Sequence, residues 1–443
     1  MSCLPWLLPG WGPWLVLLLM WGCCVAEELK PTRWPLFSQK PVLLAWNAPT
    51  EDCWPRHSIR FKLDQFEIVA SPNEGFVKQN LTIFYKDRLG LYPYFKKDGQ
   101  PVNGGLPQVA SLTEHQEKMP EGVNKYIREP KAKGLAVIDW EEWRPLWIRN
   151  WDTKDVYRNH SRLLVKQKNP TWPPEKVAKV AQQEYEMSAK RFMLETLRLA
   201  KSLRSEQLWG FYLFPDCYNH DYKNSLENYT GRCPDAEVAR NDHLTWLWTE
   251  STALFPSIYM GNVLRSTTFG RQFVRNRVKE GMRLALVGDG LARPVFVYTR
   301  PTYANELTEL TEASCSSLNE YLLGPLGRYL LNITTAAEHC SRLRCSSHGR
   351  CLRRHPDTDT YLHLSTSSHY IYREDGKLGV AGQPGTAERE LYRSEFRCQC
   401  YSGYKGDACA QTDPSQQQHG ASAGLQAWLS CLLLPLLLPA LLH

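Results

Sequence analysis

The stretch GLAVIDWEEWRPLW, residues 134–147, runs from a purely apolar segment into carboxylates and tryptophans. Its apolar part, Leu135–Ile138, has no polar alternation, which is typical of a strand that is buried on both faces of a parallel sheet. In a strand, residues i and i+2 share a face, so Asp139 and Glu141 point the same way and Glu142 points away. The stretch therefore predicts a buried strand that ends in a pair of carboxylates.

Similar apolar runs recur from residue 41 to about residue 331, with helical stretches between them. The expected strands are Val42–Trp46, Gly134–Asp139, Leu208–Phe214, Ser257–Met260 and Pro294–Tyr298. The clearest helix is expected at Glu175–Arg204, which follows two prolines and has apolar residues at helical spacing. Buried strands separated by helices predict a parallel α/β fold, and about 300 residues of this pattern favour a (β/α) TIM-like barrel over an open sheet.

The composition is that of a globular protein with a sizeable core. The chain has 443 residues, enough for one large domain and a small one, and 43% of them are hydrophobic. Its 16 tryptophans suit both a core and a carbohydrate cleft. A net charge of +7 favours an acidic partner but does not identify one.

The N-terminal end of the chain has the features of a secretory signal. Residues 1–26 contain the apolar run Trp14–Met20 and end in Cys24-Val25-Ala26, a small-x-small cleavage pattern. The run is too short for a spanning anchor, although no basic residue precedes it. We therefore expect the chain to enter the secretory pathway.

The C-terminal end has the features of a lipid-anchor signal. The apolar run Leu425–Leu442 follows small and polar residues at 416–422, and only His443 comes after it. A single spanning helix normally has basic residues on its cytoplasmic side, so a GPI-anchor signal is favoured over such a helix. The expected location is the cell surface, with the lysosome as the alternative.

Ten cysteines remain once both ends are set aside, and an even number behind a secretory signal predicts five disulfides. With these thiols paired, a cysteine nucleophile is not expected. Four glycosylation sequons agree with an extracellular or luminal protein. They begin at Asn80, Asn159, Asn228 and Asn332.

The composition changes after residue 336. The spacing Cys340-x4-Cys345-x5-Cys351 and Cys398-x-Cys400-x8-Cys409 resembles an EGF-like module with a long inserted loop. That resemblance implies the pairs Cys340–Cys351, Cys345–Cys398 and Cys400–Cys409. The basic run Arg342–Arg354 is interpreted as a solvated face, with a polyanion contact as the alternative. The expected divisions are a signal at 1–26, a barrel domain at 27–335, an EGF-like module at 336–411, and a spacer with anchor signal at 412–443.

Asp139 and Glu141 are the first candidates for chemistry. The C-terminal end of a barrel strand opens onto the catalytic face, and two carboxylates held close together favour a proton on one of them. Glycoside hydrolysis needs a proton for the leaving oxygen and a second charge for the developing cation. From the spacing alone, the alternative is a pair of surface acids that form ion pairs with Arg144.

Other classes of chemistry lack a sequence signal. The 12 histidines form no HExxH or other ligand spacing, so no metal is expected. No GxGxxG or GxxxxGK[ST] loop occurs, and no cofactor or nucleic-acid partner is expected.

Several long motifs resemble the animal hyaluronidases, and the resemblance spans nearly the whole chain. The motifs are GLAVIDWEEWRPLWIRNW, ASPNEGF (70–76), IFYKDRLGLYP (83–93), WGFYLFPDCYNHDY (209–222), ALFPSIYM (253–260) and, most similar to the membrane-anchored members, YTGRCPDAEVARND (229–242). The resemblance implies a (β/α) barrel, an EGF-like module and hydrolysis of β-1,4 bonds after N-acetylglucosamine in hyaluronan. It implies hyaluronan as partner, with chondroitin as a second polysaccharide, attachment to the membrane through a lipid anchor, and a monomer.

The resemblance also implies roles for single residues. Glu141 would be the general acid and base, and Asp139 would orient the acetamido group of the substrate. In this family the carbonyl oxygen of that group attacks the anomeric carbon, so no enzyme nucleophile is needed. Tyr212 and Tyr259 would hold the acetamido group and the sugar. The further residues implied are Tyr85 and Arg144 in the cleft, Arg277 for a glucuronate carboxylate, the aromatics of 140–147 around the sugar, and the disulfides Cys53–Cys315 and Cys217–Cys233.

The sequence departs from the family between Tyr303 and Cys315. Only Ala304–Ser314 lies there, whereas the family has a helix and a final strand with a cleft tryptophan. Such a unit needs about 30 residues. A barrel without it has unpaired strand edges and exposed apolar surface. We therefore expect reduced activity, and two alternatives remain: a cell-surface hyaluronan-binding protein without turnover, and an interaction protein that works through the EGF-like module.

Overall fold

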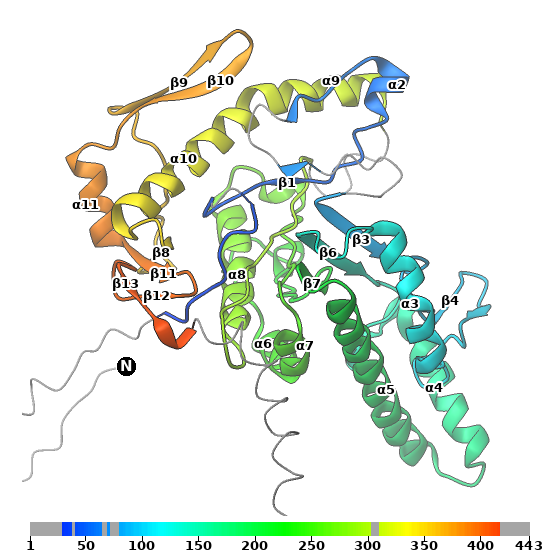
Figure 1. Cartoon of the computed structure of the whole chain (residues 1–443). Helices are drawn as coiled ribbons and strands as arrows, with labels where there is room; N and C mark the ends of the chain where they lie inside the picture. Colours follow the sequence, from blue (N-terminus) through cyan, green and yellow to red (C-terminus); the bar gives the residue numbers. More distant parts are fainter. Residues whose placement is uncertain (1–28, 38–39, 64–68, 71–78, 303–309, 417–443) are drawn as a thin grey trace, which may run out of the picture.

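The computed structural model describes residues 29–37, 40–63, 69–70, 79–302 and 310–416 (Figure 1). The expected signal at 1–26 and the apolar run Leu425–Leu442 lie outside these residues. Within the described part of the chain, no helix is long and apolar enough to cross a bilayer.

The centre of the larger domain is a parallel sheet in the order β3–β6–β7, formed by Leu81–Tyr85, Gly134–Asp139 and Gln207–Phe211. Tyr85 pairs with Asp139 at the end of the β3–β6 ladder. Every residue of β6 before Asp139 is buried, because its apolar side chains face packed elements on both sides of the sheet. The predicted strand at 134–139 is therefore confirmed, and its carboxyl end carries Asp139.

The curved sheet continues beyond β7 through single parallel bridges. These bridges join Tyr212 to Phe255, Leu254 to Val295, and Ser257 to Tyr298. The expected strands at Ser257–Met260 and Pro294–Tyr298 are thus irregular segments in this structure, held by isolated bridges instead of a continuous ladder. The order of these parallel segments is that of a (β/α) barrel.

Helices cover the outside of the sheet (Figure 1). The helices α3, α4, α5 and α8 comprise Leu112–Tyr126, Asp155–Lys168, Pro174–Leu203 and Thr268–Ala285, and the shorter α6 and α7 comprise Asp235–His243 and Thr245–Glu250. Helix α5 packs on β7 and α3. Of its apolar positions at helical spacing, Val177, Ala181, Tyr185, Ala189, Phe192 and Leu197 are buried, and Val180 is half-buried. Their burial in one core with Trp209 and Trp248 confirms the expected amphipathic helix.

Smaller elements surround the beginning of the barrel. A short parallel pair joins β1 to β2, and a hairpin joins β4 to β5 beyond β3. The helix α2 precedes the hairpin in the sequence and is held to α9 by a disulfide. The bounds are Ala45–Trp46 (β1), Cys53–His57 (α2), Val69–Ala70 (β2), Tyr94–Phe95 (β4), Pro101–Val102 (β5) and Glu312–Tyr321 (α9).

The last strand segment of the barrel has one paired edge among the described residues. Backbone hydrogen bonds join 294–298 to 254–258, through Phe296 N to Leu254 O at 2.8 Å and Tyr298 N to Pro256 O at 2.8 Å. Toward β1, a half-open cavity of about 450 Å³ lies between Pro294–Thr299 and Val42–Ala45; its lining is mostly apolar and also includes Leu352 and Tyr401 of the C-terminal module. It lies where a further strand would join the first and last strands of a closed barrel.

The C-terminal module begins within a long helical segment. Helix α9 continues through a kinked turn, Leu322–Leu326, into α10, which comprises Gly327–Arg344. The kink is at Gly324 and Pro325, where the proline removes a backbone donor. Helix α10 crosses the boundary expected at 335/336, so Cys340 lies on a helix that starts in the preceding domain.

Short antiparallel pairs form the rest of the module, and the long inserted loop is itself folded. Strand β8 pairs with β11, β12 pairs with β13, and the insert contains the β9–β10 hairpin and the helix α11. In Figure 1 the hairpin projects above α10. The bounds are Gly349–Arg353 (β8), His369–Glu374 (β9), Lys377–Gly382 (β10), Thr386–Glu395 (α11), Phe396–Cys400 (β11), Tyr404–Lys405 (β12) and Gln411–Thr412 (β13).

The described residues contain five disulfides, and these join the pairs expected from the sequence. The bonds are Cys53–Cys315, Cys217–Cys233, Cys340–Cys351, Cys345–Cys398 and Cys400–Cys409. The first closes a loop of 262 residues and connects α2 to α9, so it links the beginning of the barrel to the helix that follows the shortened segment.

Candidate active site

Asp139 and Glu141 lie at the carboxyl end of β6 in different environments. Asp139 is half-buried, and its Oδ1 atom is fully covered without a hydrogen-bond partner among the described residues. Burial, together with the carboxylates of Glu141 and Glu142, raises the pKa of Asp139 to about 7. The side chain of Glu141 is 52% exposed. The pair therefore combines a covered carboxyl group that retains its proton near neutral pH with an open carboxyl group that a substrate can reach.

Glu142 points away from this pair, as the strand alternation predicted. Its carboxylate forms an ion pair of 2.6 Å with Lys86, which also lies over the ring of Tyr94. The third acid of the stretch is thus engaged by a cation on the neighbouring segment.

Four tyrosines lie near Asp139. Tyr212 donates a hydrogen bond of 3.1 Å to the hydroxyl of Tyr259, and the ring of Tyr298 contacts the ring of Tyr212 edge-on at 4.8 Å. Burial and the hydrogen bond to Tyr259 raise the pKa of Tyr212. Burial and the charge of Asp139 raise the pKa of Tyr85, which pairs with Asp139 across the β3–β6 ladder. These phenols are therefore protonated donors at neutral pH.

Tyr298 was not among the residues predicted to be in the site. It comes from the run PVFVY, which was interpreted only as a buried strand. Its bridge partner Ser257 and its ring contact with Tyr212 place it with the other tyrosines. The i, i+2 alternation of the run gives Phe296 and Tyr298 the same face, which was the available signal.

Arg144 is held against Glu141 by its own loop. Its guanidinium lies 3.8 Å from the Glu141 carboxylate and donates to the Glu141 main-chain carbonyl at 3.2 Å. The buried Asn150 bonds both the main-chain N–H and the carbonyl of Arg144, and Tyr185 from α5 donates to the same carbonyl at 2.9 Å. The packing of α5 thereby fixes the position of a cation at the acid.

The tryptophans of the opening stretch are core residues, which corrects the expectation that they surround the sugar. Trp140, Trp143 and Trp147 are 5%, 2% and 7% exposed. The rings of Trp140 and Trp143 stack on Tyr92 at 4.4 and 5.3 Å. An indole is large enough to anchor a loop by burial alone, so these side chains stabilise the turn that carries Glu141.

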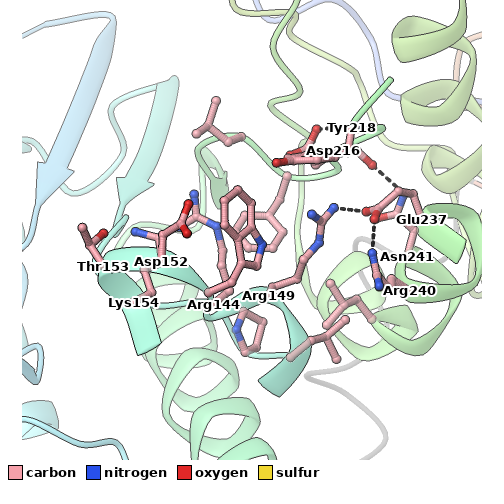
Figure 2. A pocket seen from close by; sticks show the side chains of 16 residues that line it. Arg144, Arg149, Asp152, Thr153, Lys154, Asp216, Tyr218, Glu237, Arg240 and Asn241 are labelled. Atoms are coloured by element: carbon pink, nitrogen blue, oxygen red, sulfur yellow. Dashed lines mark hydrogen bonds and ion pairs between the residues drawn. The ribbon is translucent and has the colours of Figure 1, made fainter. Parts of the chain in front are cut away.

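A further pocket is lined by Arg144 (Figure 2), whose guanidinium lies next to Glu141. Its lining includes Arg149, Trp151, Lys154 and Tyr218, none of which was predicted as a site residue. They lie on the irregular segments 147–154 and 213–218, where no periodic pattern marks which side chains share a surface.

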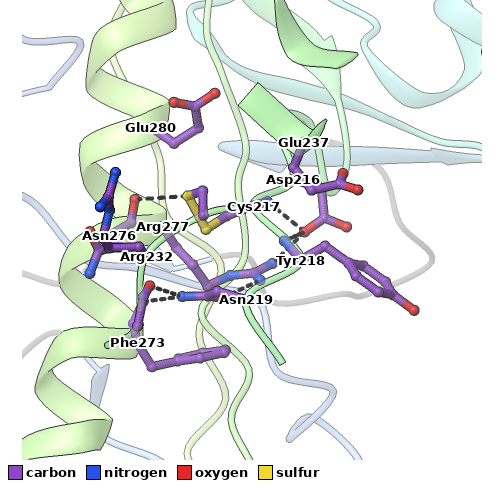
Figure 3. Close-up of a disulfide and its surroundings, with 12 residues drawn as sticks. Asp216, Cys217, Tyr218, Asn219, Arg232, Glu237, Phe273, Asn276, Arg277 and Glu280 are labelled. Atoms are coloured by element: carbon purple, nitrogen blue, oxygen red, sulfur yellow. Dashed lines mark hydrogen bonds and ion pairs between the residues drawn. A yellow bond between two sulfur atoms is a disulfide. The ribbon is translucent and has the colours of Figure 1, made fainter. Parts of the chain in front are cut away.

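Arg277 is placed differently from its expected role as a ligand for glucuronate. It is 6% exposed, and its guanidinium donates to Ser257 O, to Asn219 Oδ1 at 3.2 Å and to Asp216 Oδ1 at 2.9 Å (Figure 3). Burial would raise the pKa of Asp216, but Arg277 and nearby backbone N–H groups hold it below its ordinary value. Arg277 therefore stabilises the loop closed by Cys217–Cys233 from its buried side, where a ligand in solution cannot reach the guanidinium.

The comparisons with known proteins identify the family. A model of the family described as hyaluronidase matches residues 31–314 and 309–413. The chain belongs to the hyaluronidase family of glycoside hydrolases. It is similar to hyaluronidase-2 of Homo sapiens, at 47% identity over 95% of each chain, and to hyaluronidase-2 of Bos taurus, at 47% identity over 98% of this chain and 99% of the relative.

Among solved structures, the chain is similar to bee venom hyaluronidase in complex with a hyaluronic acid tetramer. The TM-score is 0.57 at 27% identity, and the match covers 65% of this chain and 98% of the bee chain. This likeness agrees with the barrel described above.

The comparisons also locate a difference within the hyaluronidase family. The alignment with the bovine relative spans 471 residues, more than the 443 of this chain, so the relative has residues that this chain lacks. The family model matches in two segments that meet at residues 309–314. This is the place where a helix and a strand were expected to be missing, and it precedes α9, next in the chain to the strand segment with one paired edge.

Proposed function

We propose that this protein hydrolyses hyaluronan internally, at the β-1,4 linkages between N-acetylglucosamine and glucuronate, by retaining, substrate-assisted acid/base catalysis. The observation that carries the proposal is the unequal pair at the end of β6: Asp139 is covered and has a pKa of about 7, and Glu141 is open to solvent two residues away. Two carboxyl groups with different environments are the arrangement that glycoside hydrolysis requires.

In the proposed reaction, the pair shares one proton. The N–H of the substrate's acetamido group would bind the carboxylate of Asp139, which shifts the proton to Glu141. The acetamido carbonyl oxygen attacks the anomeric carbon, the bond to the glucuronate oxygen breaks, and Glu141 gives its proton to that oxygen. Glu141 then takes a proton from water as the water opens the cyclic intermediate, so the anomeric configuration is retained.

The neighbouring residues would orient the sugar. Tyr259 accepts from Tyr212, so its own hydroxyl proton is free to bond the substrate. Tyr85, opposite Asp139, would donate to the same sugar. Arg144 at 3.8 Å from Glu141 would stabilise the carboxylate that forms when the acid gives up its proton.

The proposal includes attachment to the cell surface through a lipid anchor, after removal of the signal at 1–26, and action as a monomer. Three sequon residues, Asn80, Asn159 and Asn228, are exposed, which leaves room for glycans. Chondroitin would be a second substrate because it has the same alternation of an acetamido sugar and a glucuronate.

A second candidate function is hyaluronan binding without turnover. The cavity of about 450 Å³ beside the strand segment 294–298 favours it, because this segment carries Tyr298, which packs against Tyr212. A strand segment with one paired edge among the described residues holds these tyrosines less firmly. Small displacements of catalytic groups lower the rate by large factors.

Glu141→Gln distinguishes the two functions. The test is to incubate the purified mature chain and the variant with hyaluronan across pH 3.5–7, to resolve the products by electrophoresis, and to measure hyaluronan binding in parallel. Products from the parent and none from the variant, with retained binding, support hydrolysis. Binding without products from either chain supports the second candidate, and the absence of both contradicts the family-based proposal.

A further inference from the structure

The pocket beside Glu141 is a hollow of about 250 Å³ (Figure 2), and Arg144 and Lys154 in its lining both contact Glu141. Its walls come from the loop after β6, from the segment after β7 and from α6. Asp139, Glu141, Tyr212 and Tyr259 do not line it. It therefore lies outside the group of residues that would hold the acetamido sugar.

Arg144 and Lys154 connect this pocket to the acid. Both line the pocket, and both donate to the main-chain carbonyl of Glu141. Arg144 also lies 3.8 Å from the Glu141 carboxylate. In the proposed reaction Glu141 gives its proton to the departing glucuronate. The residues next to Glu141 that do not face Asp139 would therefore contact the leaving part of the polysaccharide.

The pocket has more cationic groups than its own acids neutralise. Arg149 and Arg240 both form ion pairs with Glu237. Asp216 is engaged by Arg277 from behind at 2.9 Å. Lys154 has no ion pair with a described carboxylate. Burial and the charge of Arg144 lower the pKa of Lys154, although the carboxylates of Glu141 and Glu142 act in the opposite direction.

Two exposed aromatic rings stand at the pocket. Trp151 is 42% exposed and Tyr218 is 36% exposed, and their rings meet edge-on at 5.9 Å. The guanidinium of Arg149 lies 4.7 Å over the ring of Tyr218. Figure 2 shows Arg149 extended across the middle of the pocket toward Glu237. Exposed rings next to cations offer an apolar face for a sugar and charge for its carboxylate.

Backbone strain is concentrated in the same place. Leu213, Tyr218 and Asp152 all line the pocket and have positive φ angles of 65°, 49° and 52°. This conformation is costly for residues with a side chain, above all for leucine, and it persists where the surroundings over-determine it at functional sites. The lining is thus held in a defined shape.

We propose that this pocket binds a uronate unit of the polysaccharide on the leaving-group side of the cleaved bond, with Lys154 and Arg144 at its carboxylate and Trp151 with Tyr218 against its ring. The inference rests on the proposed function and adds to it four contacts, three of them on residues without a predicted role. It assigns the choice of an anionic polysaccharide over a neutral one to Lys154.

The test measures binding, so it does not depend on the rate of turnover. In the Glu141→Gln background, the affinity for a hyaluronan octasaccharide and for a neutral N-acetylglucosamine hexamer is measured by calorimetry for Trp151→Ala, Lys154→Met and Lys154→Arg. The matched control is Trp54→Ala, because Trp54 is also exposed, at 50%, and lies 4.7 Å from the guanidinium of Arg60 on another part of the surface.

We expect Trp151→Ala and Lys154→Met each to weaken octasaccharide binding on the order of tenfold, which is about 1.4 kcal/mol. Lys154→Arg should restore most of it, and Lys154→Met should leave hexamer binding unchanged. Octasaccharide affinities equal to that of Trp54→Ala would overturn the inference while leaving the proposed function in place. A parent that binds no hyaluronan would contradict the proposed function, and with it the ligand assigned to the pocket.

Discussion

Asp139 lies directly opposite Tyr85 in the parallel register of β6 and β3, and the charge of Asp139 makes ionisation of Tyr85 less favourable. Burial acts in the same direction on both groups, and it is the larger cause for each. Asp139 and Tyr85, at the ends of their strands, therefore both tend to stay protonated near neutral pH. This relationship determines the expected pH behaviour of the protein.

Activity should fall as the pH rises through about 7. The pair Asp139 and Glu141 needs one shared proton, and the first group to release it does so with a pKa of about 7. Above that pH the acid has no proton to give to the leaving oxygen. The measurement is kcat/KM on hyaluronan from pH 4 to 9. A profile that stays flat to pH 9 would show that the proton comes from elsewhere.

The free energy of unfolding should also depend on Asp139. Its ordinary pKa is 3.8, and it is about 7 in the folded chain. Between these values the folded state binds the proton more tightly, so stability falls as the pH rises from 4 to 7 and is constant above 7. In Asp139→Asn, the decrease in the free energy of unfolding between pH 4 and pH 7 should be smaller by about 2 kcal/mol, a value that allows for partial solvent screening. Urea unfolding of both chains at pH 4 and pH 8 measures it, and an equal loss in both chains would exclude Asp139 as its source.

Arg277→Met should destabilise the fold by about 2–3 kcal/mol, because it removes the donor to the buried Asn219 and takes one cation from Asp216, whose side chain is 40% exposed. The control is Arg56→Met. Arg56 pairs with Asp52 at 3.0 Å, but its side chain is 63% exposed, so the expected change is below about 1 kcal/mol. Thermal unfolding of both variants distinguishes a structural role of Arg277 from a role in substrate binding. An Arg277→Met chain of unchanged stability with a raised KM for hyaluronan would support the glucuronate contact expected from the sequence.

Tyr259→Phe should lower kcat more than Tyr212→Phe. Tyr212 donates to Tyr259, which leaves the Tyr259 proton for the substrate, whereas the proton of Tyr212 is already used. Loss of one donor at an acyl or glycosyl centre costs on the order of a hundredfold in kcat. The comparison requires steady-state kinetics of both variants and their thermal midpoints. The opposite ranking, at equal stability, would place Tyr212 at the substrate instead.

The sequence was sufficient where one periodicity dominates and insufficient where contacts are set by tertiary packing. The apolar run before Asp139 and the helical spacing around Tyr185 predicted β6 and α5 within one or two residues. The burial of Trp143 could not be predicted, because an indole next to acids suits a core and a sugar site equally. Arg277 was assigned by a shared motif, which carries no information on which way its guanidinium points.

The pocket around Lys154 illustrates the same limit. Its residues come from irregular segments separated by about sixty positions, and only the folded chain brings Trp151 within ring contact of Tyr218. The shortened segment before Cys315, in contrast, was visible in the sequence, because a missing helix and strand reduce the number of residues between Tyr303 and Cys315. Its physical consequence, the cavity between Val42–Ala45 and Pro294–Thr299, required the structure.

Restoring the missing unit should stabilise the barrel. The change is to insert, within residues 309–314, the segment that the bovine relative has and this chain lacks. A strand placed in the cavity beside Pro294–Thr299 would pair the edge that has no ladder partner among the described residues, and it would bury the apolar lining. The thermal midpoint should rise by several degrees. Hyaluronan hydrolysis should increase on the order of tenfold, because Tyr298 and Tyr212 would be held more firmly.

A glycine-serine insert of the same length at the same point serves as the control, since it lengthens the loop without supplying a strand. It should leave the thermal midpoint unchanged or lower, because longer flexible loops only add closure entropy. Equal thermal midpoints for the two inserts would mean that the cavity does not accept the strand. The edge at 294–298 would then have to be stabilised in another way, and the reduced activity expected of this chain would not arise from an open barrel.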